Sequence, residues 1–381
     1  MEFSFGIEHE VAFLRENNQF ADFTNTTFAE FNRLIALLPL YPGDYPLLHV
    51  GDAGIRVKRW YIEGVERLSD TGELVNCIPK GIEIRTTRHS DIGGVIRELS
   101  DSFAALQAVA RPCGLTPVCT SFNPFQVEYA YDPPLTEYEK QLHEESADFQ
   151  AEALAMLTYG PDLNLSLSEL STAQVIDAAR KLTCYSPYLV PWSFNSPFYA
   201  GKLWVGLSVR THVRSGQRSA VRVFVEEEEQ LISSTPVLTK LARTVHEVGR
   251  IEFKAFDSCG DFGRYAALLA LLKGLVLDQS LPGRATLPDV ALHREAAQEG
   301  FRSATIRNGA SRLLAAAETA LGRDPDAALL GSLHPSLHTQ TTPAHALWSS
   351  YQQTGSIIDA LRQSCGRTYR SSIQEALGLR A

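Results

Sequence analysis

The chain has 381 residues, of which 44% are hydrophobic and 21% are charged, a composition that supports a sizeable folded core. Its net charge of −9 argues against a nucleic-acid-binding protein that relies on attraction to phosphate. The N-terminus lacks the basic start and apolar run of a signal peptide, and the longest apolar stretch, residues 265–277, is too short to cross a membrane. We therefore expect a cytoplasmic protein that contacts neither nucleic acid nor membrane. The oligomeric state stays open.

Helical patterns are interspersed with strand-like segments along the first three quarters of the chain. Apolar residues recur at helical spacing in residues 28–38, 91–110, 138–157, 170–182 and 261–278. Beyond residue 287 the pattern is mainly helical, and no Gly/Ser-rich linker precedes it. We predict one compact domain, with a sheet-and-helix core over residues 1–287 and a helical C-terminal extension over residues 288–381 packed on it.

Five segments alternate apolar and polar residues, which is typical of strands with one buried face. These segments are residues 3–13, 81–86, 162–167, 205–213 and 250–256. Antiparallel sheets commonly pack one face on a core and leave the other face polar. The pattern therefore predicts an α+β fold with one largely antiparallel sheet flanked by helices.

The polar faces of these strands are rich in charged residues. They carry Glu8, Glu10, Glu83, Asp162 and Glu252, together with Arg210, Arg250 and Lys254. Acidic residues are poor strand formers, and two like charges 4 Å apart cost about 4 kcal/mol at an effective dielectric of about 20. Because hard divalent cations take oxygen ligands, the pattern predicts a metal-lined sheet face that handles phosphate. A solvated sheet face is the alternative for any single strand.

Several common motifs are missing from the sequence. It contains no phosphate-binding G-x-x-x-x-G-K-[ST] loop, no strand-linked G-x-G-x-x-G and no C-x-x-C pair. The six cysteines are widely scattered, so we expect reduced thiols. His9 falls on the apolar face of its strand and is expected to be a core histidine, whereas residues 226–229, four glutamates, are expected to be solvated.

Four short motifs follow one another along the chain. They are G-I-E-H-E at residues 6–10, G-I-E-I-R-T at residues 81–86, F-N-S-P-F at residues 194–198 after Y-S-P-Y, and R-I-E-F-K-A-F-D-S-C at residues 250–259. In this order they resemble the glutamate–cysteine ligase superfamily, in its branch of carboxylate–amine ligases from cyanobacteria and other bacteria. The similarity runs from residue 6 to about residue 260.

The resemblance implies a cupped sheet related to the glutamine synthetase catalytic domain, with ATP and Mg²⁺ as cofactors and an acyl-phosphate intermediate. It implies metal ligation by Glu8, Glu10, Glu83 and Glu252, with Asp162 at a position where the family commonly has His. Arg210 and Lys254 would contact phosphate or a substrate carboxylate, and Asn164 and Asn195 would orient substrate. Lys254 stands where the family usually has Arg, so a point charge replaces a bidentate fork.

The resulting prediction is an ATP-dependent ligase that joins glutamate to cysteine through a γ-glutamyl phosphate, an activity of glutathione biosynthesis. Its expected partners are small-molecule substrates. Three alternatives stay open at this point. The same activation could serve another amine or acid, the carboxylates could form a two-metal phosphoesterase with water as nucleophile, or the fold could bind metal or nucleotide without catalysis.

Overall fold

The computed structural model describes residues 2–44 and 58–366 of the chain. Its strands are β1 (Phe3–Arg15), β2 (Phe20–Ala21), β3 (Trp60–Leu68), β4 (Leu74–Arg85), β5 (Leu115–Val118), β6 (Pro161–Leu167), β7 (Phe198–Tyr199), β8 (Lys202–Leu203), β9 (Val221–Val225), β10 (Thr239–Leu241) and β11 (Ile251–Phe253). Its α-helices are α1 (Phe28–Leu37), α2 (Ile92–Ala110), α3 (Glu137–Glu145), α4 (Ala147–Gln150), α5 (Glu152–Ala155), α6 (Thr172–Leu189), α7 (Val209–Arg214), α8 (Phe262–Leu277), α9 (Val290–Glu299), α10 (Ala304–Leu321), α11 (His334–Thr339), α12 (Pro343–Thr354) and α13 (Ile357–Gly366).

One sheet organises the molecule. Its strands follow the order β10-β9-β11-β6-β1-β4-β3, and β2 and β5 pair with the second half of β1. Every neighbouring pair is antiparallel except β10 and β9, which are parallel. The predicted α+β fold with a largely antiparallel sheet flanked by helices is therefore confirmed.

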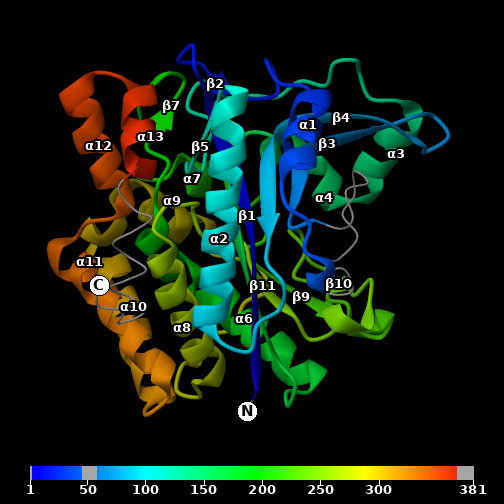
Figure 1. The fold of residues 1–381 in the computed structure, drawn as a ribbon. Helices are drawn as coiled ribbons and strands as arrows, with labels where there is room; N and C mark the ends of the chain where they lie inside the picture. Colours follow the sequence, from blue (N-terminus) through cyan, green and yellow to red (C-terminus); the bar gives the residue numbers. More distant parts are fainter. Residues whose placement is uncertain (1, 45–57, 367–381) are drawn as a thin grey trace.

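The apolar face of the sheet packs against helices. On β1, Phe3, Phe5 and Ile7 are at most 6% exposed and alternate with half-buried residues, as the period of two requires. Helix α2 runs in front of β1, with α8 and the C-terminal helices beside it (Figure 1). His9 also lies on this face, buried against Phe262 and Tyr265 of α8, so its assignment as a core histidine is confirmed.

The predicted helices agree with the structure where capping signals are strong. Asp91 caps α2 and Asp261 caps α8, each by accepting a backbone N–H three residues on. The single helix predicted over residues 138–157 is wrong, because the chain breaks into α3, α4 and α5 there. The breaks fall at Ser146, whose backbone is extended, and at Ala151, whose backbone leaves the helical region.

The strand predicted over residues 205–213 is also wrong. Ser208 accepts a hydrogen bond from the Thr211 backbone N–H at 2.9 Å and so starts the short helix α7. The alternation that suggested a strand does not reflect a common face, because Val205 is 80% exposed and Leu207 is fully buried. Arg210 therefore lies on helix α7 and not on the sheet.

Helix α10 shares the main core, whereas the buried residues of α13 belong to a second cluster that includes Val118 of β5. Leu313 and Leu314 of α10 belong to the same buried cluster as Leu268 and Leu271 of α8. A domain boundary near residue 287 stays a prediction.

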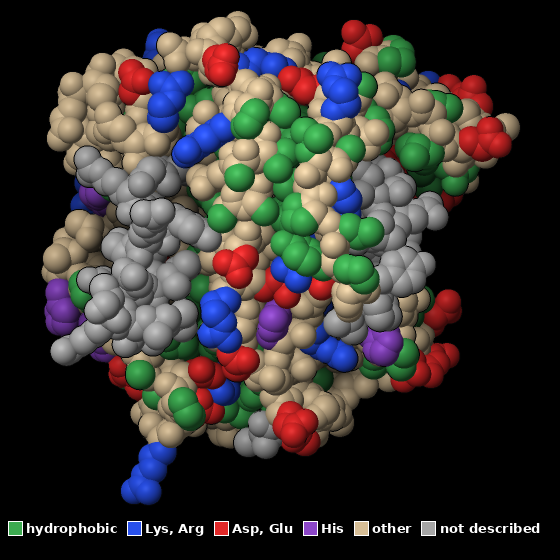
Figure 2. Space-filling model, viewed as in Figure 1, with side chains coloured by type: hydrophobic (Ala, Val, Ile, Leu, Met, Phe, Trp, Pro, Cys, Tyr) green, Lys and Arg blue, Asp and Glu red, His purple; other side chains and the backbone are tan. Residues whose placement is uncertain are grey.

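In the described part of the chain, no helix has the length and apolar content needed to cross a membrane. On the face shown in Figure 2, acidic and basic side chains are interspersed and apolar ones gather in the upper half, so charge of one sign does not dominate there.

Candidate active site

A pocket of about 550 Å³ lies on the polar face of the sheet. Its charged lining comes from strands far apart in the sequence. The acidic members are Glu8, Glu10, Glu63, Glu83, Asp162, Glu247 and Glu252, and the basic members are Arg85, Arg88, Arg218, Arg222, Lys240, Arg243, Arg250 and Lys254. A pocket of this volume is in the usual range for small-molecule sites.

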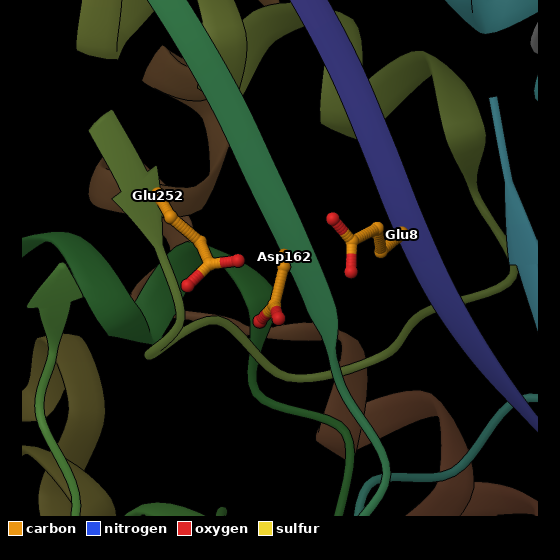
Figure 3. Close-up of side chains that lie close together, drawn as sticks. All are labelled: Glu8, Asp162 and Glu252. Carbon is orange, nitrogen blue, oxygen red and sulfur yellow. The ribbon is translucent and has the colours of Figure 1, made fainter. Parts of the chain in front are cut away.

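The first carboxylate group joins Glu8, Asp162 and Glu252. Strand register explains it, because Glu8 lies directly opposite Asp162 and Glu252 pairs with Asn164, two residues further along β6 and on the same face. One oxygen from each carboxylate lies within 4.8 Å of the others. Figure 3 shows the three side chains converging on one space from β1, β6 and β11.

The second carboxylate group joins Glu10, Glu63 and Glu83. Glu10 lies opposite Glu83 in the β1–β4 pair, and Glu63 extends from the neighbouring strand β3. Their oxygens also lie within 4.8 Å of one another. Like charges facing each other across strands are destabilising, so two such groups on one sheet face require compensation by cations.

Basic side chains compensate the first group. The Lys254 ammonium contacts the Asp162 carboxylate and lies 3.0 Å from Oε2 of Glu252, and Arg250 Nη1 lies 3.3 Å from Oε1 of Glu8. Burial together with Glu252 and Glu8 still raises the pKa of Asp162 to about 6. Burial opposes ionisation of Glu252 too, but Lys254 and Arg250 outweigh it and bring the pKa of that carboxyl to about 2.

Nearby cations neutralise the negative charge of the second carboxylate group less fully. Burial is the main reason that the pKa of Glu63 rises to about 7, with Lys80 opposing the rise and Glu10 adding to it. Burial and the neighbouring carboxylates of Glu63 and Glu8 likewise raise the pKa of Glu83 well above its usual range. These two acids gain most from an added cation.

The donor set fits hard divalent cations. Both groups offer carboxylate oxygens alone, which suits Mg²⁺ or Ca²⁺ better than softer metals. Asn164, 5% exposed and between Glu8 and Glu252 in the strand register, has a buried Oδ1 without a hydrogen-bond partner in the described residues. An additional oxygen ligand is therefore available beside the first group.

Most of the predicted site residues line this pocket. Glu8, Glu10, Glu83, Asp162, Glu252, Asn164 and Lys254 all do. Arg210 and Asn195 lie outside the lining. Arg210 donates to the carbonyl oxygens of Ala255 at 3.2 Å and Phe256 at 2.7 Å, and the Asn195 amide donates to Cys119 O and Ser258 O. Both side chains therefore support the chain behind the pocket.

Sequence reasoning missed Glu63 and Lys80. Residues 60–68 are rich in Trp, Tyr, Ile and Val, which is a strand signal, but a β-bulge at Glu63 and Gly64 interrupts the alternation. Lys80 precedes the alternating segment that was recognised at residue 81. At both positions the sequence offered only residue composition as a signal, without the regular apolar–polar alternation of a strand.

No family model and no curated protein matches the sequence. Among solved structures, a bifunctional glutathione synthetase from Pasteurella multocida aligns over 98% of this chain and 53% of its own, with a TM-score of 0.59 and 13% identity. Glutamate–cysteine ligase from Francisella tularensis in complex with AMP aligns over 99% and 92%, with a TM-score of 0.57 and 12% identity. The ligase PafA, in complex with the ubiquitin-like protein Pup, aligns over 100% and 76%, with a TM-score of 0.54 and 10% identity.

These similarities define the fold. The chain spans about half the length of the bifunctional enzyme and nearly all of the glutamate–cysteine ligase. Its α+β architecture is the one that these ligases share, and the resemblance to the glutamate–cysteine ligase superfamily is confirmed at the level of the fold.

Proposed function

We propose that this protein is an ATP-dependent carboxylate–amine ligase and, within that class, that it joins glutamate to cysteine. The observation that carries the proposal is the pocket itself, which is lined by two carboxylate groups and eight Arg or Lys side chains. Phosphoryl transfer needs positioning and charge neutralisation more than covalent help from the protein. The fold shared with glutamate–cysteine ligase over nearly its whole length supports the specific substrates.

The proposed reaction has two steps. A glutamate carboxylate oxygen attacks the γ-phosphorus of ATP, ADP leaves, and the cysteine amine then attacks the acyl carbon while phosphate leaves and the nitrogen gives up a proton. Mg²⁺, held by Glu8, Asp162 and Glu252 and by the second carboxylate group, would supply positive charge beside the phosphates.

The chain's own cations have separate tasks. Lys254 and Arg250 already neutralise the first carboxylate group, so they are placed to hold the transferring phosphoryl group beside it. Arg222 extends the same positive wall and is anchored by Asp148, with 2.5 Å between Nη2 and Oδ1. Fixing these groups before the reaction lowers the cost of reorganisation in the transition state.

The test is phosphate release from Mg-ATP in the presence of glutamate and each of the twenty amino acids in turn, with the product mass determined by mass spectrometry. The proposal expects release only when glutamate and cysteine are both present, and a product that equals their sum less water. Another amine would keep the ligase reaction and change the acceptor. Hydrolysis of simple phosphate esters without any ATP turnover would replace the proposal with the two-metal phosphoesterase.

Matched variants make the test specific. Glu252→Gln removes one carboxylate of the first group without changing its size, and should reduce turnover about 100-fold or more. The control is Glu228→Gln, the same change at an exposed residue outside the pocket. Equal turnover in the two variants would contradict the assignment of the pocket.

A further inference from the structure

A second, much smaller cavity lies behind strands β9 and β11. It is partly open and has room, about 10 Å³, for a particle of about the size of water. Its lining includes three hydroxyl residues, Thr211, Ser215 and Ser219, and three basic residues, Arg214, Arg218 and His293, although most of its surface is apolar. The reaction proposed above gives none of these side chains a step of its own, although Arg218 is one of the eight basic side chains of the large pocket.

Positive charge is in excess around this cavity. Arg214 is 8% exposed, and its Nη2 donates to Lys254 O at 3.1 Å and to Ser219 O at 3.4 Å. Within residues 2–44 and 58–366, neither Arg214 nor Arg218 forms an ion pair with a carboxylate. A buried charge without a counter-charge costs several kcal/mol. Burial, together with Arg210 and Arg218, accordingly pushes the pKa of Arg214 well below its usual range.

The carboxylates that act on these arginines, Asp162 and Glu10 on Arg214 and Asp148 on Arg218, already form ion pairs with Lys254, Lys80 and Arg222. Asp257 Oδ1 lies 4.0 Å from Nη1 of Arg210, one turn before Arg214. Its two oxygens already accept hydrogen bonds from the Asn195 backbone N–H and from the hydroxyls of Ser196 and Ser208. Asp257 therefore stabilises the chain around Asn195. The residues that line the cavity include no acidic side chain.

One hydroxyl group that lines the cavity has no hydrogen-bond partner in the described residues. It is the Oγ1 group of Thr211, which is 3% exposed. An unsatisfied buried hydroxyl costs about 1–3 kcal/mol. A particle that accepts hydrogen bonds from Thr211 and from the adjacent guanidinium groups would satisfy both the hydroxyl and the charge.

We propose that this cavity binds a small monovalent anion, with chloride as its physiological representative, between the Thr211 hydroxyl and the guanidinium groups of Arg214 and Arg218. A water molecule would satisfy the hydroxyl and leave the charge uncompensated. The small size of the cavity favours a monatomic anion over phosphate or larger oxyanions. Because Arg214 donates to the Lys254 carbonyl, the bound anion is linked through one side chain to the backbone that positions Lys254 in the active site.

The direct test is a crystal of the full chain soaked in sodium bromide, with diffraction data collected at the bromine absorption edge. An anomalous peak between Thr211 and Arg214 is the expected result. A water molecule in the cavity, or bromide only in the large pocket, would overturn the proposal. The measurement needs no catalytic activity, so its failure is distinct from failure of the proposed function.

A solution test uses two matched substitutions. Thr211→Val and Thr183→Val each remove a buried, unpartnered hydroxyl, and Thr183 lies outside the cavity. Replacing sodium gluconate with sodium chloride at equal ionic strength should raise the Tm of the wild type and of Thr183→Val by about 2 °C. The rise should be lost in Thr211→Val, while its Tm in gluconate matches that of the control. Equal chloride dependence in both variants would refute the site.

Discussion

The ammonium nitrogen of Lys80 lies 2.7 Å from Oε1 of Glu10, and only 1% of the lysine is exposed. The same nitrogen donates to the carbonyl oxygens of Ala155 and Thr158, so all three of its N–H groups are used. The other oxygen of Glu10 accepts the Gly160 N–H at 2.6 Å. Lys80 therefore holds Glu10 in place and ties the chain before β6 to the second carboxylate group.

Removing Lys80 should leave Glu10, a half-buried carboxylate, without its nearest counter-charge. We expect Lys80→Met to lower the free energy of unfolding by about 3–5 kcal/mol, measured by urea denaturation. The double variant Lys80→Met, Glu10→Gln should recover part of this loss, because the remaining side chain is neutral. A loss below about 1 kcal/mol in the single variant would show that the pair contributes little.

Glu63 should contribute to Mg²⁺ binding, although sequence periodicity did not identify it. Replacing it with Gln removes one of the three carboxylates of the second group, and the apparent Mg²⁺ affinity should fall about tenfold or more. Calorimetric titration with MgCl₂ measures this without any turnover. Glu73→Gln, in the exposed β3–β4 turn, is the matched control. Unchanged affinity in Glu63→Gln would remove it from the ligand set.

Sequence periodicity identified all three carboxylates of the first group and two of the three in the second, Glu10 and Glu83. Glu8, Asp162 and Glu252 each lie in a regular strand segment, where a period of two shows which side chains share a face. Glu63 lies at a bulge that breaks the period. Arg210 was misplaced because α7 is only 6 residues long, too short for helical periodicity to outweigh an accidental alternation.

Arg210 should now behave as a structural residue. Its guanidinium donates to three backbone carbonyls, those of Lys254, Ala255 and Phe256. Arg210→Lys should lower the free energy of unfolding by about 1–3 kcal/mol, because a single ammonium cannot reach all three. The KM for ATP should stay within about twofold of the wild type. A large rise in KM with unchanged stability would instead restore the phosphate contact that the sequence suggested.

Lys254 should act mainly through its charge. It contacts the Asp162 carboxylate and lies 3.0 Å from Oε2 of Glu252, so Lys254→Met leaves both acids without this partner. We expect kcat to fall about 100-fold in Lys254→Met and less than about tenfold in Lys254→Arg, which keeps the charge. Steady-state kinetics with Mg-ATP measures both. Equal losses would mean that the ammonium geometry, and not its charge, is required.

His293 should make the stability of the protein sensitive to acid. Burial is the main cause that lowers its pKa from 6.5 to about 4, with Arg214 adding to the effect and Asp289 opposing it. The folded state therefore holds the neutral imidazole, whose Nε2 lies 2.8 Å from the Ser186 hydroxyl. Its contribution to stability is complete above the unfolded pKa of about 6.5 and declines as the pH falls towards 4, by about 3 kcal/mol in total.

The variant His293→Gln tests this acid dependence, because an amide can replace the hydrogen bond and does not titrate. Urea denaturation at several pH values should give a free energy of unfolding that falls about 3 kcal/mol less between pH 6.5 and pH 4 than in the wild type. His338→Gln, the same substitution at an exposed side chain, is the control and should keep the wild-type slope. Parallel curves for all three proteins would show that His293 titrates alike in the folded and unfolded states.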